Sequence, residues 1–135
     1  MALTVPAGMN AQLVCLALPC TRQIAATTAD AFTLCPGFRG RVVGAACSVG
    51  AIAGTTEVTD VDIMIEKGTT DILAALMAPV GSSAIVSGGA TGTLSTTTAD
   101  LEFTATDVFH LDVTLTGGAS PTVDDTMAYL FVVPT

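Results

Sequence analysis

The sequence has no tryptophan, one histidine, one tyrosine and only four lysine or arginine residues in 135. The scarcity of cations argues against a nucleic-acid partner, because phosphate contacts need clustered positive charge and twelve aspartates and glutamates give a formal net charge of −8. Without tryptophan the chain is poorly equipped to stack sugar rings. A single histidine leaves at most one general base of the kind that Ser-His-acid catalysis requires. We therefore expect neither enzyme activity nor nucleic-acid binding.

The one histidine, His110, lies two residues from Asp112 on the polar side of a predicted strand, an arrangement that any exposed strand face contains. No G-x-S-x-G elbow, phosphate-binding loop or dinucleotide-binding motif occurs. Asp60, Asp62 and Glu66 share one strand face, where carboxylates serve as glycosidase acids, as calcium ligands or as charges that keep a strand soluble. The spaced loop of common calcium sites is absent. We predict solvated carboxylates and no cofactor, with calcium binding left open.

The four cysteines, Cys15, Cys20, Cys35 and Cys47, are too widely spaced for a zinc site, which needs close C-x2-C pairs. Each cysteine lies among alanine, leucine and valine, so we predict buried, unreactive thiols. A disulfide bridge from Cys35 to either Cys15 or Cys20 remains an alternative.

No segment has the features of a secretion signal or a membrane span. The apolar run over 13–18 has no lysine or arginine before it, and Pro6, Asn10 and Gln12 interrupt its surroundings, unlike a signal peptide. The longest later uncharged run, 72–80, is far shorter than the ~20 residues that cross a bilayer. We expect a soluble protein with no membrane partner.

Apolar and polar residues alternate with a period of two in two segments, which predicts half-buried strands. In residues 57–67, Val61, Ile63 and Ile65 alternate with carboxylates, and residues 107–116 repeat the scheme with Phe109 and Leu111. Residues 127–133 are apolar at every position, which predicts a central strand covered on both sides, by a facing sheet and by a neighbouring subunit.

Weaker strand patterns occupy residues 11–18, 29–35, 41–49, 93–97 and 101–105, with a helical turn predicted over 70–77 and a loop over 81–92. About eight short strands without β-α-β alternation predict an all-β, antiparallel β-sandwich, most simply a jelly roll. An immunoglobulin-like sandwich is the alternative, although its core tryptophan and its cysteine spacing are missing. The length fits one domain over 13–135, preceded by an N-terminal arm over 1–12.

Several apolar side chains fall where the alternation predicts solvent. They are Met64, Val108, Met127, Tyr129 and Phe131. A soluble monomer seldom exposes a contiguous apolar patch of more than a few hundred square ångströms. We therefore predict that these residues form an interface with other copies of the same chain.

Three segments, VDIMIEKGTTDIL at 61–73, DVFHLDVT at 107–114 and AYLFVVP at 128–134, resemble the small jelly-roll head decoration, or cement, proteins of tailed bacteriophages. The likeness covers residues 30–135 and is one of pattern and composition; Thr106 stands where related sequences commonly have a glycine. The resemblance implies a non-enzymatic structural protein of the virion, made in the host cytoplasm. Such a protein binds the outer surface of the expanded capsid as a homotrimer and stabilises it.

The resemblance also implies which residues make the contacts. Arg22, Arg39, Arg41 and Lys67 are the only cations available to meet carboxylates of the major capsid protein, and an equal alternative is that they balance the chain's own acids. The arm over 1–12 would lie on the capsid or on a neighbouring decoration subunit. The competing function is a receptor- or glycan-binding jelly-roll module of a phage fibre or tail.

Overall fold

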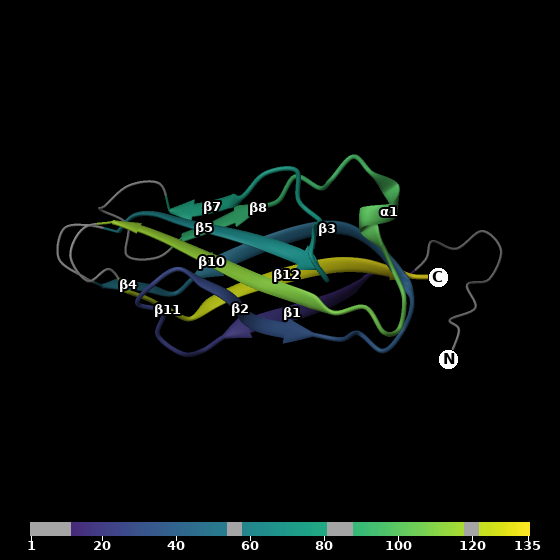
Figure 1. Ribbon diagram of the computed structural model, residues 1–135, viewed down its shortest axis with the longest axis horizontal. Helices are drawn as coiled ribbons and strands as arrows, with labels where there is room; N and C mark the ends of the chain where they lie inside the picture. The colour runs from purple at the N-terminus through teal and green to yellow at the C-terminus, as the bar shows by residue number, and fades with distance from the viewer. Residues whose placement is uncertain (1–11, 54–57, 81–87, 118–121) are drawn as a thin grey trace.

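The computed structural model describes residues 12–53, 58–80, 88–117 and 122–135, and it is a sandwich of two antiparallel sheets (Figure 1). The first sheet has the order β1-β12-β3-β8, with strands β1 (Val14–Cys20), β12 (Thr126–Pro134), β3 (Gly40–Val49) and β8 (Gly88–Thr91). The second has the order β2-β10-β5-β6, with strands β2 (Thr28–Leu34), β10 (Phe109–Gly117), β5 (Val58–Lys67) and β6 (Thr70–Asp71).

Short elements complete the two sheets and their ends. Strand β7 (Met77–Val80) pairs with β5, and β9 (Glu102–Phe103) pairs with β3. Strands β4 (Ala51–Ala53) and β11 (Thr122–Asp124) form a separate pair, and the helix α1 (Thr98–Leu101) lies at the opposite end of the sandwich (Figure 1). Within the described part of the chain, no helix is long and apolar enough to cross a membrane.

The strand order is that of a jelly roll. Except for the step from β5 to β7, consecutive main strands lie in different sheets, which gives β1-β12-β3-β8 facing β2-β10-β5-β7. The predicted fold class is therefore confirmed, and the immunoglobulin-like alternative is wrong. The arm expected over 1–12 lies almost entirely outside the described residues.

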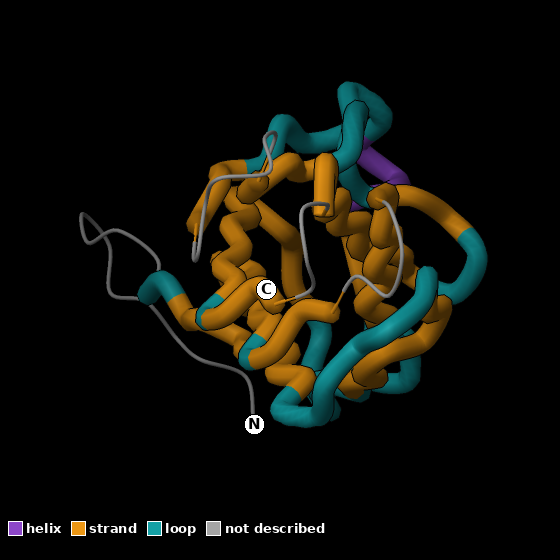
Figure 2. Tube along the Cα trace, turned by 90° about the vertical axis from the view of Figure 1, so that its left-hand side faces the viewer, coloured by secondary structure: helices purple, strands orange, loops and turns teal. Residues whose placement is uncertain are grey.

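One apolar core fills the space between the sheets. Viewed from one end, the strands surround this single interior (Figure 2). The period-two alternation places the inward side chains as predicted, and nine of them are fully buried: Val61, Ile63, Ile65, Phe109, Leu111, Val113, Ala128, Leu130 and Val132. The ring of Phe103 packs edge-on against Phe109 and Phe38, with centroid distances of 5.3 and 5.8 Å.

Strand β12 is central, as predicted, because it pairs with β1 on one side and β3 on the other. Its inner face is covered by the second sheet, since Ala128, Leu130 and Val132 have no exposed surface. Its outer face is only half-buried, because no other described segment of the chain forms a layer over it. The predicted cover by the facing sheet is therefore confirmed, and the predicted cover by a neighbouring subunit stays a prediction.

The helical turn predicted over 70–77 is wrong. That segment forms β6, a bridge from Leu73 to Leu94, and the start of β7. The backbone N–H of Ile72 donates to the carbonyl of Ile65, and the Ile72 carbonyl accepts from Ser95 N–H, so its polar groups are used between strands. Burial of Ile72, Leu73 and Met77 outweighs the local helical pattern.

Three other predicted segments differ from the structure. The strand expected over 93–97 is reduced to the bridge at Leu94, and the one expected over 101–105 is reduced to β9, which follows α1. Part of the loop expected over 81–92 is strand β8, and its residues 81–87 lie outside the described ones. Glycine and alanine carry no periodic pattern, so β8 is identified only by its pairing with β3.

Candidate functional site

The outer face of the second sheet is acidic. On β5, Asp62, Met64 and Glu66 point away from the core, and the ladder with β10 sets Met64 opposite Asp112 and Glu66 opposite His110. Like charges on neighbouring strands repel one another. This face therefore favours solvent or a cationic partner over burial against an apolar surface.

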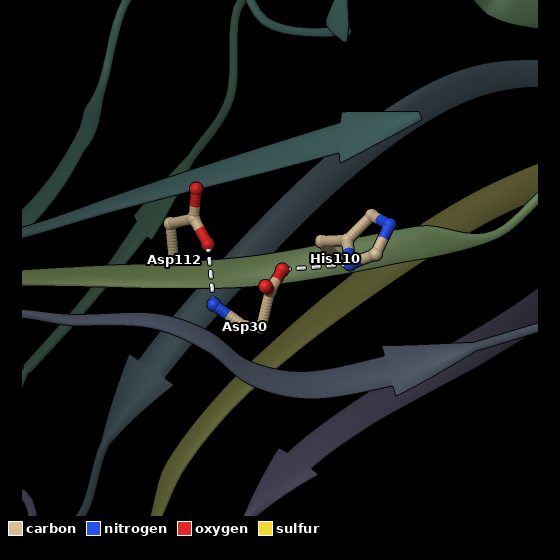
Figure 3. A network of polar contacts seen from close by, with 3 residues as sticks. All are labelled: Asp30, His110 and Asp112. Atoms are coloured by element: carbon tan, nitrogen blue, oxygen red, sulfur yellow. Dashed lines mark hydrogen bonds and ion pairs between the residues drawn. The ribbon is translucent and has the colours of Figure 1, made fainter. Parts of the chain in front are cut away.

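His110 joins two strands through Asp30 of β2 (Figure 3). The Nδ1 atom of His110 lies 2.7 Å from Oδ1 of Asp30, and the backbone N–H of Asp30 donates to Oδ1 of Asp112 at 2.7 Å. Asp30 has a φ of +53°, and the register between β2 and β10 shifts at this point, which marks a bulge. Aspartate tolerates this left-handed conformation better than most residues.

Sequence analysis placed His110 beside Asp112, and the structure instead links each of them to Asp30. Sequence reasoning missed Asp30, because its role depends on a strand 80 residues away in the chain. The only available signal was an aspartate within a predicted strand. The arrangement fixes a bulge at the sheet edge, and it explains the histidine without any chemical step.

Two carboxylates on the acidic face have raised pKa values. The pKa of Glu66 is raised, first by partial burial and then by repulsion from Asp112. Asp71 raises it further through a hydrogen bond and through charge repulsion, whereas the nearby His110 lowers it. The pKa of Asp62 is raised by partial burial and by the charge of Asp60 nearby. Ionisation of these groups therefore destabilises the folded state at neutral pH.

Replacing Glu66 by glutamine is expected to raise the melting temperature at pH 7 by a small amount, about 1–2 °C. A raised folded-state pKa means stability that is complete below the unfolded value of about 4.3 and is lost as pH rises through the folded value. The gain from Glu66→Gln should therefore vanish at pH 4. Calorimetry at both pH values checks this, and an equal shift at pH 4 and pH 7 would contradict the electrostatic cause.

The outer face of the first sheet is apolar. Met127, Tyr129 and Phe131 point outward from β12, half-buried, and the ladder with β1 sets Tyr129 beside Ala17 and Phe131 beside Cys15. The Tyr129 hydroxyl lies 3.4 Å from the sulfur of Met127, so the polar end of the tyrosine is held within the face. Three predicted interface residues are thus contiguous.

The same face extends onto β3 and beyond β1. Ala46 and Gly44 are the β3 neighbours of Tyr129 and Phe131, and a Cβ atom on Gly44 would lie 3.2 Å from the Phe131 ring. Val43 is 48% exposed and Leu13 is 57% exposed. We define the apolar face by eight residues: Leu13, Cys15, Ala17, Val43, Ala46, Met127, Tyr129 and Phe131.

The other two predicted interface residues lie elsewhere. Met64 is half-buried on the acidic face, opposite Asp112. Val108 lies just before β10, and its carbonyl accepts a hydrogen bond from Gly68 N–H in the turn between β5 and β6. Sequence analysis missed the contribution of β1 and β3 to the apolar face, although outward Cys15 and Ala17 fall at alternate positions.

Three of the four cations lie together at one end of the sandwich. Arg39 and Arg41, at the start of β3, and Lys67, at the end of β5, line one cleft with a volume of about 730 Å³. Arg22 follows β1 near the other end, because Cys20 pairs with Thr126 at the far end of β12. The four predicted contact residues therefore do not form one surface.

The four cysteine thiols are free. The prediction of burial is right for Cys20 and Cys47 and wrong for Cys15 and Cys35, which are exposed because they fall on outward or loop positions. Burial raises the pKa of Cys47 to about 11, partly offset by a hydrogen bond involving the Ala90 backbone. Among the described residues, no group of three or more histidine, cysteine or acidic side chains is placed to hold a metal ion.

Comparison with known proteins finds chains of similar structure. No protein-family model and no curated protein matches the sequence. A chain in the capsid of Ralstonia phage GP4 superposes with a TM-score of 0.55 at 18% identity, over 100% of this chain and 91% of that one. A chain of the cyanophage Pam1 capsid asymmetric unit gives a TM-score of 0.55 at 14% identity, over 99% and 94%. Both share the jelly-roll fold, which makes up almost the whole of each chain.

Proposed function

We propose that this chain is a head decoration protein, which binds the outer surface of an expanded phage capsid as a homotrimer and stabilises it without enzyme activity. The observation that carries the proposal is the full-length structural likeness to chains from two phage capsids, each nearly the same length as this one. A jelly roll on its own serves many functions, so the surfaces must supply the rest of the argument.

The apolar face supports self-association. Its exposed valine and leucine and its half-buried methionine, tyrosine and phenylalanine form the kind of uncharged patch that protein interfaces cover. A symmetric trimer presents the same surface three times to a three-fold site on a shell. Many such contacts on one lattice add to a strong attachment even where each is weak.

Purified protein mixed with expanded, undecorated capsids of the parent phage tests the function directly. Co-sedimentation is expected with expanded capsids and not with unexpanded ones, and the bound protein should raise the temperature at which the shell breaks. A protein that binds neither form, and that is instead retained on a glycan array, would replace decoration with the fibre or tail function.

A further inference from the structure

The cleft at the α1 end of the sandwich is built from segments distant in the sequence. Arg39 and Arg41 come from the start of β3, Lys67 from the end of β5, and Glu102 and Asp107 from the segments around β9. The N–H of Thr135 donates to the Arg39 carbonyl, which extends the β3–β12 ladder by one residue and fixes the backbone beneath the arginines.

Two of the charged side chains in the cleft already make hydrogen bonds to the segments that form its walls. The Lys67 ammonium donates to the carbonyls of Ala99 and Glu102, at 2.7 and 2.6 Å, and so ties β5 to α1. The carboxylate of Asp107 accepts from the backbone N–H of Thr104 at 2.7 Å and from its hydroxyl at 3.1 Å. These bonds, with the charge of Lys67, hold the pKa of Asp107 below its usual range, so it is ionised and engaged in the turn.

Arg39 and Arg41 have no such role. Both side chains are exposed, and within the described part of the chain neither guanidinium has a hydrogen-bond or ion-pair partner. Gly40, between them, is buried against Phe103, where a Cβ atom would lie 2.7 Å from the ring. Residues on either side of an inward position in extended backbone point to the same side, so both guanidinium groups face outward together.

The side chains of the cleft carry a net positive charge, although the chain as a whole is negative. Among its side chains the cleft gathers three of four cations and only two of twelve acidic residues, so their formal charge sums to +1, whereas the side chains of the whole sequence sum to −8. A guanidinium forks to bind a carboxylate through two parallel hydrogen bonds. Two free guanidinium groups are too few for a polyphosphate, which needs an extended cluster of cations, whereas they suffice for one or two carboxylates of a protein.

We propose that this cleft is the shell-binding site, and that Arg39 and Arg41 there hold aspartate or glutamate side chains from an acidic segment of the capsid protein. The inference rests on the proposed function and adds the site, the two residues and the chemistry of the partner. In this proposal Arg22 does not contact the shell, and Lys67 stabilises the cleft through its hydrogen bonds.

Charge reversal on expanded capsids tests the site, because Arg22 provides a matched control. Arg39→Glu and Arg41→Glu should each weaken co-sedimentation at least about tenfold, and 0.5 M salt should weaken the wild-type protein similarly. Arg22→Glu, with the same change of charge at the other end, should stay within about twofold of wild type. Undiminished binding by both cleft variants would overturn the site while leaving decoration intact.

A second measurement does not depend on the capsid. Titration of a short glutamate-rich peptide into labelled protein should shift the side-chain N–H resonances of Arg39 and Arg41 to saturation and leave that of Arg22 unmoved. If the protein ignores capsids but the peptide saturates these resonances, the proposed function fails and the carboxylate site stands. Equal shifts at Arg22, or tighter binding of a short duplex DNA than of the peptide, would overturn the carboxylate site.

Discussion

Replacing Phe131 by aspartate is expected to dissociate the proposed trimer and leave the sandwich folded. Phe131 lies in the middle of the apolar face, between Cys15 of β1 and Gly44 of β3, and it points away from the core. In a separate chain an aspartate here faces water, whereas in a covered interface it is an unpaired buried charge that costs several kcal/mol. The dissociation constant, followed by sedimentation velocity over a dilution series, should rise at least about a hundredfold.

Met64→Asp is the matched control, since Met64 is also half-buried and outward but lies on the acidic face opposite Asp112. This variant adds one carboxylate to existing ones, so it should lower the melting temperature slightly and keep the trimer. The opposite pattern, in which Met64→Asp dissociates and Phe131→Asp remains trimeric, would move the interface to the β5–β10 face. Circular dichroism of both variants establishes that the fold is retained.

Sequence predicted correctly the strands in which apolar and polar side chains alternate with a period of two. On β5 and β10, aliphatic side chains alternate with carboxylates or threonine, and only one orientation buries the first set and solvates the second. Strand β12 was also recognised, because seven apolar residues in succession need cover on at least one side. Those three strands predict a sandwich, whereas the strand order that makes it a jelly roll is seen only in the structure.

The segments that sequence predicted wrongly owe their structure to pairing partners. Residues 70–77 carry a helical pattern of alanine and leucine, yet their backbone groups pair with β5 and with residues 93–95. Strand β8 is rich in glycine and alanine, which have no face to distinguish. Strand β8 pairs with β3, about 40 residues earlier, and residues 70–77 bond both to the neighbouring β5 and to residues 93–95. The local residue pattern does not indicate these pairings.

The sequence predicted which residue types form the candidate surfaces, but not where on the molecule those residues lie. Met64 and Met127 look alike in sequence, but they lie on opposite faces, because the strand that carries each belongs to a different sheet. Lys67 and Arg41 are 26 positions apart and line the same cleft only because β3 begins where β5 ends, at one end of the sandwich. The pairing between strands therefore determines which residues belong to the proposed subunit interface and which to the proposed shell-binding cleft.

Alkylation of the four thiols is expected to divide them into two classes in the folded but dissociated Phe131→Asp chain. Cys15 and Cys35 are exposed, whereas Cys20 and Cys47 are 3% and 4% exposed. The thiolate is the reactive species, so the pKa of about 11 for Cys47 lowers its reactive fraction at pH 8 about a hundredfold relative to an ordinary thiol, before burial slows it further. Mass spectrometry of maleimide-treated protein over time measures each rate.

The same reagent distinguishes a covered apolar face from an open one, because Cys15 pairs with Phe131 across the β1–β12 ladder and Cys35 lies outside that face. In the proposed trimer, Cys15 should label at least about tenfold more slowly than in Phe131→Asp, since a covered thiol reacts only when the interface opens. Cys35 should label equally in both proteins and so corrects for any general change in exposure. A trimeric wild-type protein whose Cys15 reacts as fast as in the variant would mean that the subunits meet through some surface other than this sheet.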